Sequence, residues 1–239
     1  MKPIIGIVAR PHITETNLDC MMALDPYRRA VINSGGIPIL IFPTQRINYV
    51  YTHPKDAPKL SNEEKEDLER VLKLCNGIIM PGGSRMYDYD TFITDYAYNN
   101  DIPTLGICLG MQIMAAYFAG EDIRTNALDK IDIEKNMNHN ELEKMYVHDV
   151  LLSKKSKLYE IFGKEVVKVN SRHKYVIKEK IDDNKYDIVG FSEDNFPEAM
   201  EIKNKRFFIG VQWHPESMHE EDDTMKKLFD SFIKETEKL

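Results

Sequence analysis

The sequence of 239 residues contains little cysteine, and none of it is spaced for a disulfide framework. Its three cysteines, Cys20, Cys75 and Cys108, are odd in number and form no Cys-x-x-Cys pair. Small secreted domains rely on paired cysteines to offset a small core, whereas thiols stay reduced in the cytosol. We therefore expect free thiols and a cytoplasmic location.

Long apolar runs and an excess of positive charge are also missing. No stretch approaches the roughly 20 apolar residues that span a bilayer. The first ten residues, interrupted by Pro3 and Gly6, are too short for a signal peptide. Lys and Arg number 32 against 39 Asp and Glu, a formal net charge of −7, and the basic residues form no stripe. This balance predicts neither nucleic acid nor a membrane as a partner.

No internal repeat or linker divides the chain, so we expect one domain over residues 1–239. Strand-like and helix-like segments alternate in the first half, as in a parallel sheet with helices on both faces. Asp25 and Pro26 predict a helix start, with Asp25 as the N-cap, and Ser61 to Glu64 predict a capping box. In the second half, Asn204 and Lys205 predict a two-residue hairpin turn. The expected strands are Ile4–Ala9, Ile37–Phe42, Gly77–Met80, Pro103–Ile107, Tyr146–Leu152, Val166–Asn170, Tyr175–Lys178, Tyr186–Phe191, Glu198–Lys203 and Arg206–Val211.

One cysteine inside a glycine frame is the strongest candidate for a reactive group. The segment Gly106-Ile107-Cys108-Leu109-Gly110 follows a short apolar strand and precedes an apolar stretch of three helical turns. On such a turn, a nucleophile elbow, the backbone is strained and the flanking glycines let the strand and the helix cross closely. The helix N-terminus also favours a thiolate. The pattern predicts chemistry at the sulfur of Cys108.

A second motif, Trp213-His214-Pro215-Glu216, follows an apolar strand near the other end of the chain. His214 and Glu216 are two residues apart, so in an extended chain both side chains point to one side, and Pro215 stiffens the backbone between them. A cysteine nucleophile needs a base and a group that orients this base. We therefore expect a catalytic triad of Cys108, His214 and Glu216.

The other histidines show no spacing typical of metal ligands, and the His214-x-Glu216 pair has no third ligand near it. The sequence therefore predicts neither a metal site nor a cofactor. The histidines considered are His12, His53, His139, His148 and His219.

Taken together, three motifs resemble those of the class I glutamine amidotransferases: Pro81-Gly82-Gly83, the cysteine turn with Gln112, and the His-Pro-Glu segment. Chain length, the start of the chain and Asn170-Ser171-Arg172-His173 are most similar to the γ-glutamyl-γ-aminobutyrate hydrolases (peptidase C26). The resemblance implies a flavodoxin-like, mostly parallel α/β sheet flanked by helices, with additional antiparallel strands in the C-terminal half. It also implies hydrolysis of a γ-glutamyl amide through a thioester on Cys108.

The same resemblance assigns roles around the triad. The backbone amides of Gly83 and Leu109 would form the oxyanion hole. The substrate would contact a further set of residues, namely Gly82, Gln112, Asn170, Ser171 and His173. Each motif also has a structural alternative. These are an ordinary strand-ending turn for the glycine pair, a helix residue bonded to a neighbouring loop for Gln112, and a polar turn between two strands for residues 170–173. By position, residues 44–60 and 121–145 would set selectivity. Arg10, Arg85 and Arg124 are equal candidates for the carboxylate of the substrate, and the alternative for each is a place at the surface.

The sequence departs from the hydrolase branch in the pocket. Leu109 stands where that branch commonly has arginine, and Lys174-Tyr175 follows His173 where a His-Gln pair is usual. These departures concern the identity of the substrate and not the type of reaction. The first hypothesis is a free-standing hydrolase of γ-glutamyl amides, including γ-glutamyl amines, since water is the simplest acceptor for the acyl-enzyme; a homodimer is compatible with it. The alternative is a glutaminase subunit that supplies ammonia to a separate synthetase. A third hypothesis, a non-enzymatic redox-responsive protein, is disfavoured because a sensor needs no general base.

Overall fold

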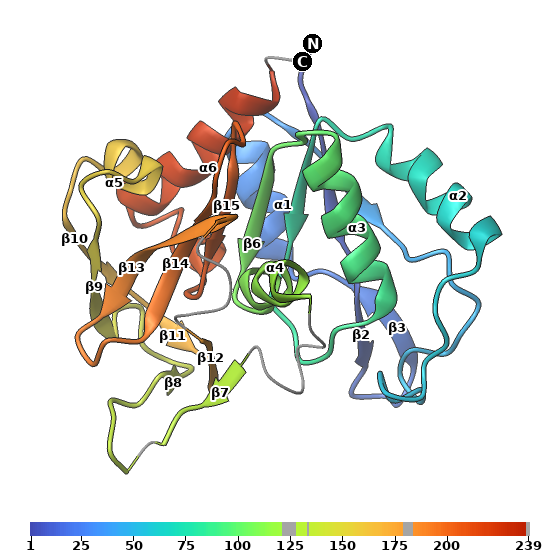
Figure 1. Ribbon diagram of the computed structural model, residues 1–239, viewed down its shortest axis with the longest axis horizontal. Helices are drawn as coiled ribbons and strands as arrows, with labels where there is room; N and C mark the ends of the chain where they lie inside the picture. Colours follow the sequence, from blue (N-terminus) through green and yellow to red (C-terminus); the bar gives the residue numbers. More distant parts are fainter. Residues whose placement is uncertain (121–127, 133, 179–183, 238–239) are drawn as a thin grey trace.

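A nine-stranded mixed sheet forms the centre of the molecule (Figure 1). The computed structural model describes residues 1–120, 128–132, 134–178 and 184–237. The predicted flavodoxin-like α/β architecture is confirmed: five neighbouring strands are parallel, and four antiparallel strands extend the sheet on one side. In sheet order the strands are β10 (Val166–Val169), β9 (His148–Leu152), β13 (Tyr186–Ser192), β14 (Pro197–Ile202), β15 (Phe208–Val211), β6 (Thr104–Ile107), β5 (Gly77–Met80), β1 (Ile4–Val8) and β4 (Ile37–Ile41).

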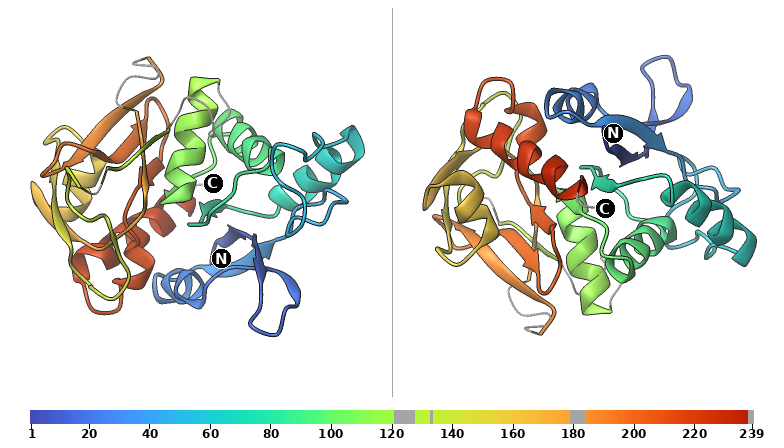
Figure 2. Two further views of the ribbon diagram at one scale, coloured as in Figure 1. Left: turned by 90° about the horizontal axis from the view of Figure 1, so that it is seen from below. Right: turned by 90° about the horizontal axis from the view of Figure 1, so that it is seen from above.

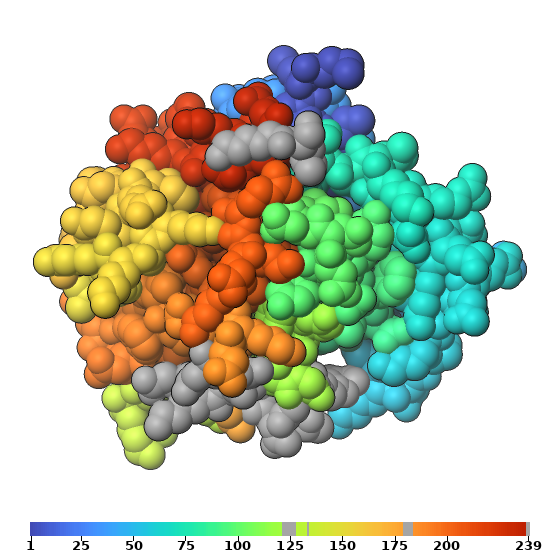
Figure 3. All heavy atoms as spheres, turned by 45° about the horizontal axis from the view of Figure 1, so that its top comes forward, coloured from blue at the N-terminus to red at the C-terminus, as the bar shows by residue number. Residues whose placement is uncertain are grey.

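Helices cover both faces of this sheet (Figure 2). One apolar cluster contains buried residues of the helices α2 (Asn62–Leu72), α3 (Asp88–Asn99) and α4 (Leu109–Ala119). A second cluster contains buried residues of α1 (Asp25–Asn33), α5 (Lys157–Phe162) and α6 (Asp223–Thr236). Helix α4 is buried almost all round, as expected for a helix without a polar face. Figure 3 shows the α5 region (yellow) and the α2 region (cyan) at opposite ends of the molecule. No helix in the described ranges is long and apolar enough to cross a membrane.

Three small two-stranded sheets lie at the end of the molecule opposite the chain termini (Figure 1). They pair β2 (Arg10–Ile13) with β3 (Asp19–Met22), β7 (Leu128–Lys130) with β12 (Tyr175–Ile177), and β8 (Asn140–Glu141) with β11 (Ser171–Arg172). The expected strand at 175–178 therefore forms here and not in the main sheet. The β2–β3 hairpin was not predicted. Residues 121–127 and 133 of the proposed selectivity segment lie outside the described residues.

Local sequence signals explain the helix starts. The capping box is confirmed, because the Ser61 hydroxyl accepts the Glu64 N–H at 3.2 Å and the Glu64 carboxylate accepts the Ser61 N–H at 2.8 Å. Asp25 is the first residue of α1 and not its N-cap, which is Leu24. The Asp25 carboxylate instead accepts a hydrogen bond from Arg28 at 2.6 Å, an exposed pair of small energetic weight.

The β14–β15 hairpin is present, but its turn is longer than two residues. Strand pairing stops at residue 201 on one side and resumes at 209 on the other, and Asn204 has a positive φ of 60°. Within this connection, Arg206 binds Asp101 through its guanidinium at 2.9 Å. A side chain in the loop thus fastens it to the end of α3, which a pattern of turn residues alone does not predict.

Candidate active site

Cys108 lies on the sharp turn between β6 and α4. Its backbone has φ 53° and ψ −105°, a combination that residues with a side chain rarely adopt. A Cβ atom on Gly110 would overlap the carbonyl oxygen of Met80, and one on Gly106 would lie 2.8 Å from the carbonyl carbon of Gly110. Only glycine therefore allows the helix to pass this close to the sheet. The predicted cysteine turn is present.

His214 and Glu216 meet just after the end of β15. Nδ1 of the imidazole lies 2.7 Å from Oε1 of Glu216. The expectation of an extended segment is wrong, because Pro215–Ser217 forms one turn of 3-10 helix. This turn still brings the carboxylate to the ring, and Glu216 is only 1% exposed. The buried carboxylate can hold the Nδ1 proton and leave Nε2 for another group.

Cys108 and His214 converge because β6 and β15 are parallel neighbours that end at the same level. Both side chains pack against Gly82, where a Cβ atom would lie 2.8 Å from Cε1 of His214 and 3.6 Å from Cβ of Cys108. Burial by itself would lower the pKa of His214. The charges of Glu216 and Cys108, together with their hydrogen bonds to the ring, outweigh burial and raise this pKa to about 10. The ring is therefore an imidazolium at neutral pH.

Two backbone N–H groups beside Cys108, those of Gly83 and Leu109, donate to no acceptor within the described residues. Leu109 is the first residue of α4, so its N–H belongs to the unpaired first turn of the helix. A Cβ atom on Gly83 would lie 3.0 Å from Cδ2 of Leu109, so the two residues are direct neighbours. Both border the cavity that contains Cys108, and their N–H groups could stabilise a negative charge there.

Tyr27 of α1 also belongs to this site, although the sequence did not indicate it. Its hydroxyl oxygen accepts a hydrogen bond from the Gly82 N–H at 2.9 Å. Burial, and then the nearby Glu216 carboxylate, raise the pKa of Tyr27 well above its usual value. Tyr27 therefore keeps its proton and connects the glycine loop to Glu216. The residue comes from a distant helix, and no local motif marks it.

Asn170 fixes the backbone of His214. Its Oδ1 accepts the His214 N–H at 2.7 Å, and its Nδ2 donates to the His214 carbonyl at 2.9 Å. The side chain therefore holds both backbone polar groups of His214, and it does not border the cavity over Cys108. A contact between Asn170 and the substrate stays a prediction. Its position after the edge strand β10 lets it reach the loop that carries His214.

The two other residues expected from this segment also face the protein interior. The hydroxyl of Ser171 donates to the carbonyl of His139 at 2.9 Å, and Ser171 does not border the cavity, so its expected substrate contact also stays a prediction. His173 borders the cavity, but its Nδ1 faces the carbonyl of Tyr175 at 3.1 Å and its Nε2 faces Glu198 at 3.3 Å. Its ring nitrogens are thus directed away from a substrate.

Gln112 borders the cavity one helical turn after Cys108, as expected. Its amide nitrogen donates to the carbonyl of Tyr175 and to the side-chain oxygen of Gln212, both at 3.1 Å. Gln112 therefore ties α4 to β12 and to the residue after β15. Both of its N–H groups are used for this purpose.

A cavity of about 660 Å³ lies over Cys108, and its described lining holds no carboxylate. Of the arginines considered for the substrate, Arg85 borders this cavity, whereas Arg124 lies outside the described residues. Arg10 is buried and pairs with Asp90 and with the Pro81 carbonyl, so it supports the glycine loop. The cationic lining residues are Lys55, Arg85, Arg172 and Lys174.

Comparison with known proteins relates this geometry to one family. The family model of glutamine amidotransferase class-I matches residues 48–235. CTP synthase of Lactobacillus delbrueckii is 29% identical over 214 residues, covering 79% of this chain and 40% of the relative. CTP synthase of Porphyromonas gingivalis is 30% identical over 207 residues, with 77% and 37% covered. The chain thus spans about two fifths of the length of these relatives.

A relative of similar length and two solved structures extend the comparison. A Schizosaccharomyces pombe protein provisionally named a glutamine amidotransferase is 28% identical over 232 residues, covering 87% of this chain and 80% of the relative. The glutaminase domain of Trypanosoma brucei CTP synthase, with bound acivicin, has a TM-score of 0.68 at 19% identity over 99% of this chain and 94% of that one. A Thermoplasma acidophilum protein provisionally assigned to GMP synthase, as one of its subunits, has a TM-score of 0.64 at 17% identity, with 100% and 96% covered. These structures share the fold.

Proposed function

Because this chain belongs to the class I glutamine amidotransferase family, we propose that it is a glutaminase that releases ammonia from glutamine for a separate synthetase. The observation that carries this proposal is the convergence of Cys108, His214 and Glu216 beside a cavity. The sulfur is the nucleophile, the imidazole transfers protons, and the carboxylate holds the imidazole.

In the first half of the reaction, the Cys108 thiolate attacks the carbonyl carbon of the side-chain amide. The negative charge moves to the carbonyl oxygen, where the N–H groups of Gly83 and Leu109 stabilise it. The C–N bond then breaks as the imidazolium of His214 gives its proton to the leaving nitrogen. Ammonia departs, and a γ-glutamyl thioester remains on the sulfur.

In the second half, the neutral ring of His214 takes a proton from a water molecule, whose oxygen attacks the thioester carbonyl. The C–S bond breaks, glutamate leaves, and the pair returns to thiolate and imidazolium. Glu216 stabilises the charged ring in both halves because it is buried and bound to Nδ1. The complete cycle consumes one amide and one water molecule and releases ammonia and glutamate.

The glutaminase hypothesis is supported by the relatives reported above, several of which are CTP synthases, and by the similar fold of a glutaminase domain. It is also supported by Leu109, the residue after the nucleophile, which is common in biosynthetic amidotransferases. In this hypothesis a synthetase chain receives the ammonia.

A second candidate is hydrolysis of γ-glutamyl amines that carry an additional carboxylate, of which γ-glutamyl-γ-aminobutyrate is an example. The cavity of about 660 Å³ is large for glutamine alone, and its described lining holds four cations and no carboxylate. Such a lining suits a substrate with more than one negative charge. The two candidates share the triad and differ in the leaving amine.

The test measures ammonia and glutamate release from glutamine, and amine release from a panel of γ-glutamyl amines, with the purified full chain. We expect Cys108→Ser to lose about 10⁴-fold of the activity, while Cys20→Ser, a matched change at a half-buried cysteine, keeps it. Rapid acid quenching and mass spectrometry should show one γ-glutamyl group on the wild type and none on Cys108→Ala.

The substrate panel separates the two candidates. Low glutaminase activity that rises on addition of a co-purified synthetase supports the first. Faster turnover of γ-glutamyl amines than of glutamine by the chain alone supports the second. Absence of an acyl-enzyme with every compound would reject both.

A further inference from the structure

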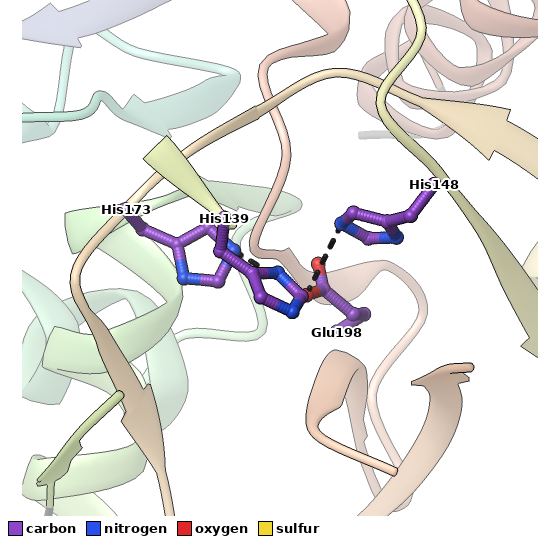
Figure 4. A group of neighbouring side chains, drawn as sticks. All are labelled: His139, His148, His173 and Glu198. Atoms are coloured by element: carbon purple, nitrogen blue, oxygen red, sulfur yellow. Dashed lines mark ion pairs between the residues drawn. The ribbon is translucent and has the colours of Figure 1, made fainter. Parts of the chain in front are cut away.

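Three histidines and one glutamate meet in the interior of the antiparallel half, separate from the triad. One ring nitrogen of each histidine and a carboxylate oxygen all lie within 4.8 Å of one another, and each residue is at most 5% exposed. Figure 4 shows the rings directed toward the carboxylate from different segments. The residues are His139 in the connection before β8, His148 in β9, His173 between β11 and β12, and Glu198 in β14.

The spacing within this cluster resembles that of ligands around a metal ion. Oε1 of Glu198 lies 3.4 Å from Nδ1 of His139, 3.7 Å from Nε2 of His148 and 3.3 Å from Nε2 of His173. These distances are long for N–H···O hydrogen bonds. Four ligands at about 2.0–2.1 Å from a tetrahedral zinc ion are about 3.3–3.4 Å apart. The three distances from Glu198 are therefore close to those around such an ion, and the four ligand atoms, all within 4.8 Å of one another, would move closer together to bind it.

In two of the rings, the nitrogen that faces away from Glu198 contacts a backbone carbonyl. Nδ1 of His148 lies 3.2 Å from the carbonyl oxygen of Asp149, and Nδ1 of His173 lies 3.1 Å from that of Tyr175. Since a carbonyl only accepts, both Nδ1 atoms donate, and a ring that carries this one proton presents a lone pair at Nε2. These Nε2 atoms and both oxygens of Glu198 lack a hydrogen-bond partner within the described residues.

His139 has the same arrangement with the ring turned round. Its Nε2 lies 3.1 Å from both carboxylate oxygens of Asp194, which leaves Nδ1 directed at Glu198. Asp194 is itself held by the Ser192 hydroxyl at 2.7 Å. A histidine whose outer nitrogen binds a carboxylate or a carbonyl is typical of metal centres, where this contact orients the ring.

We propose that His139, His148, His173 and Glu198 bind one divalent transition-metal ion, with zinc the best fit. Three imidazole nitrogens and one carboxylate oxygen in a tetrahedral arrangement are a donor set that zinc accepts. The two positive charges of the ion balance the negative charges of Glu198 and Asp194. Protonating all three rings instead would leave an excess positive charge in a buried cluster, which is costly.

All four coordination positions are filled by protein, so the site is structural and not catalytic. The ion would fasten β9, β14 and the segment that contains Asn170, and thereby support the loop of His214. Spacing along the sequence did not reveal these ligands, because they come from four separate segments. The inference does not depend on the proposed function.

The test begins with the full chain purified without added chelator and analysed for metal by inductively coupled plasma mass spectrometry. We expect about one zinc ion per chain, removal by a strong chelator with a lower unfolding temperature, and recovery on addition of zinc. Cobalt(II) added to the metal-free protein should give the visible absorption bands of a tetrahedral site. A wild type that binds neither ion stoichiometrically when they are supplied would overturn the proposal.

Variants assign the site to these residues. Glu198→Gln and His148→Gln should lose stoichiometric metal, and Asp194→Asn, which keeps all four ligands, should weaken zinc binding about 10- to 100-fold. His219→Gln changes a histidine that is 4% exposed and outside the cluster, and it should keep the metal. Circular dichroism checks that each variant is folded. Should folded Glu198→Gln and His148→Gln keep one zinc per chain, the assignment is wrong.

Discussion

The imidazole of His214 has to give a proton in one half of the proposed reaction and take one in the other. Its pKa, raised to about 10 against burial by the Glu216 and Cys108 charges, determines which form the free enzyme holds. Because the folded-state pKa lies above the ordinary value of 6.5, the imidazolium persists through the neutral range. It is lost only as the pH rises through about 10.

We therefore predict that kcat/KM falls as the pH rises through about 10. In Glu216→Gln the amide still contacts the ring but the negative charge is gone, so the alkaline limb should move to lower pH. The maximal rate should also fall, by up to about 10⁴-fold. Initial rates between pH 6 and about 10.5 measure both effects. An alkaline limb unmoved by the substitution would contradict this assignment of charge.

Tyr27 is a positioning residue, because it touches the Gly82 N–H and Glu216 but not the cavity over Cys108. Tyr27→Phe leaves the Gly82 N–H without its acceptor, a loss of about 1–2 kcal/mol. We expect kcat to drop about 10-fold with KM little changed, since the loop next to Gly83, the proposed oxyanion donor, loosens. A matched change at Tyr159→Phe, a tyrosine of α5 away from the site, should leave both constants unaltered. A rise in KM alone would argue against positioning.

The crossing of β5, β6 and α4 sets the position of Cys108. Gly110→Ala would push a methyl group onto the Met80 carbonyl oxygen. We expect the free energy of unfolding to fall by about 1–3 kcal/mol or more. The activity should also fall. Gly163→Ala is the control: it has a φ of +66° but open space around it, so it should lose only about 1–2 kcal/mol and keep the activity. Denaturant unfolding and initial rates are measured for both variants, and full activity in Gly110→Ala would contradict the role of this crossing.

Features that depend only on residues adjacent in the chain could be predicted from the sequence. The cysteine turn needs glycines on both sides, and the Ser61 capping box is completed within four residues, so the sequence shows each feature directly. Tyr27 and Asn170 act across the fold, and nothing beside them in the chain indicates their partners. The small sheets and the histidine cluster were missed for the same reason, because each joins segments that become neighbours only after folding.

The site depends on how the two halves of the chain are joined. β15, the last strand, lies in the middle of the sheet, parallel to β6 on one side and antiparallel to β14 on the other. Its register pairs Val211 with Ile107, and the Cys108 N–H donates to the Val211 carbonyl at 2.8 Å. The two motifs therefore meet because the C-terminal half inserts its last strand beside the N-terminal half.

Asn170 is a second connection between distant parts, since it follows the edge strand β10 and yet holds the loop after β15. Asn170→Ala removes both hydrogen bonds to His214. We expect the free energy of unfolding to fall by about 1–3 kcal/mol. We also expect kcat to fall about 10²-fold, as for a displaced catalytic group. Asn170→Asp can still accept the His214 N–H but cannot donate to its carbonyl, so it should fall between the wild type and Asn170→Ala. Asn100→Asp changes an exposed asparagine that donates only to Tyr96 of its own helix, and it should shift stability by less than about 0.5 kcal/mol. Full activity in Asn170→Ala would show that the loop of His214 holds its place without support from the antiparallel half.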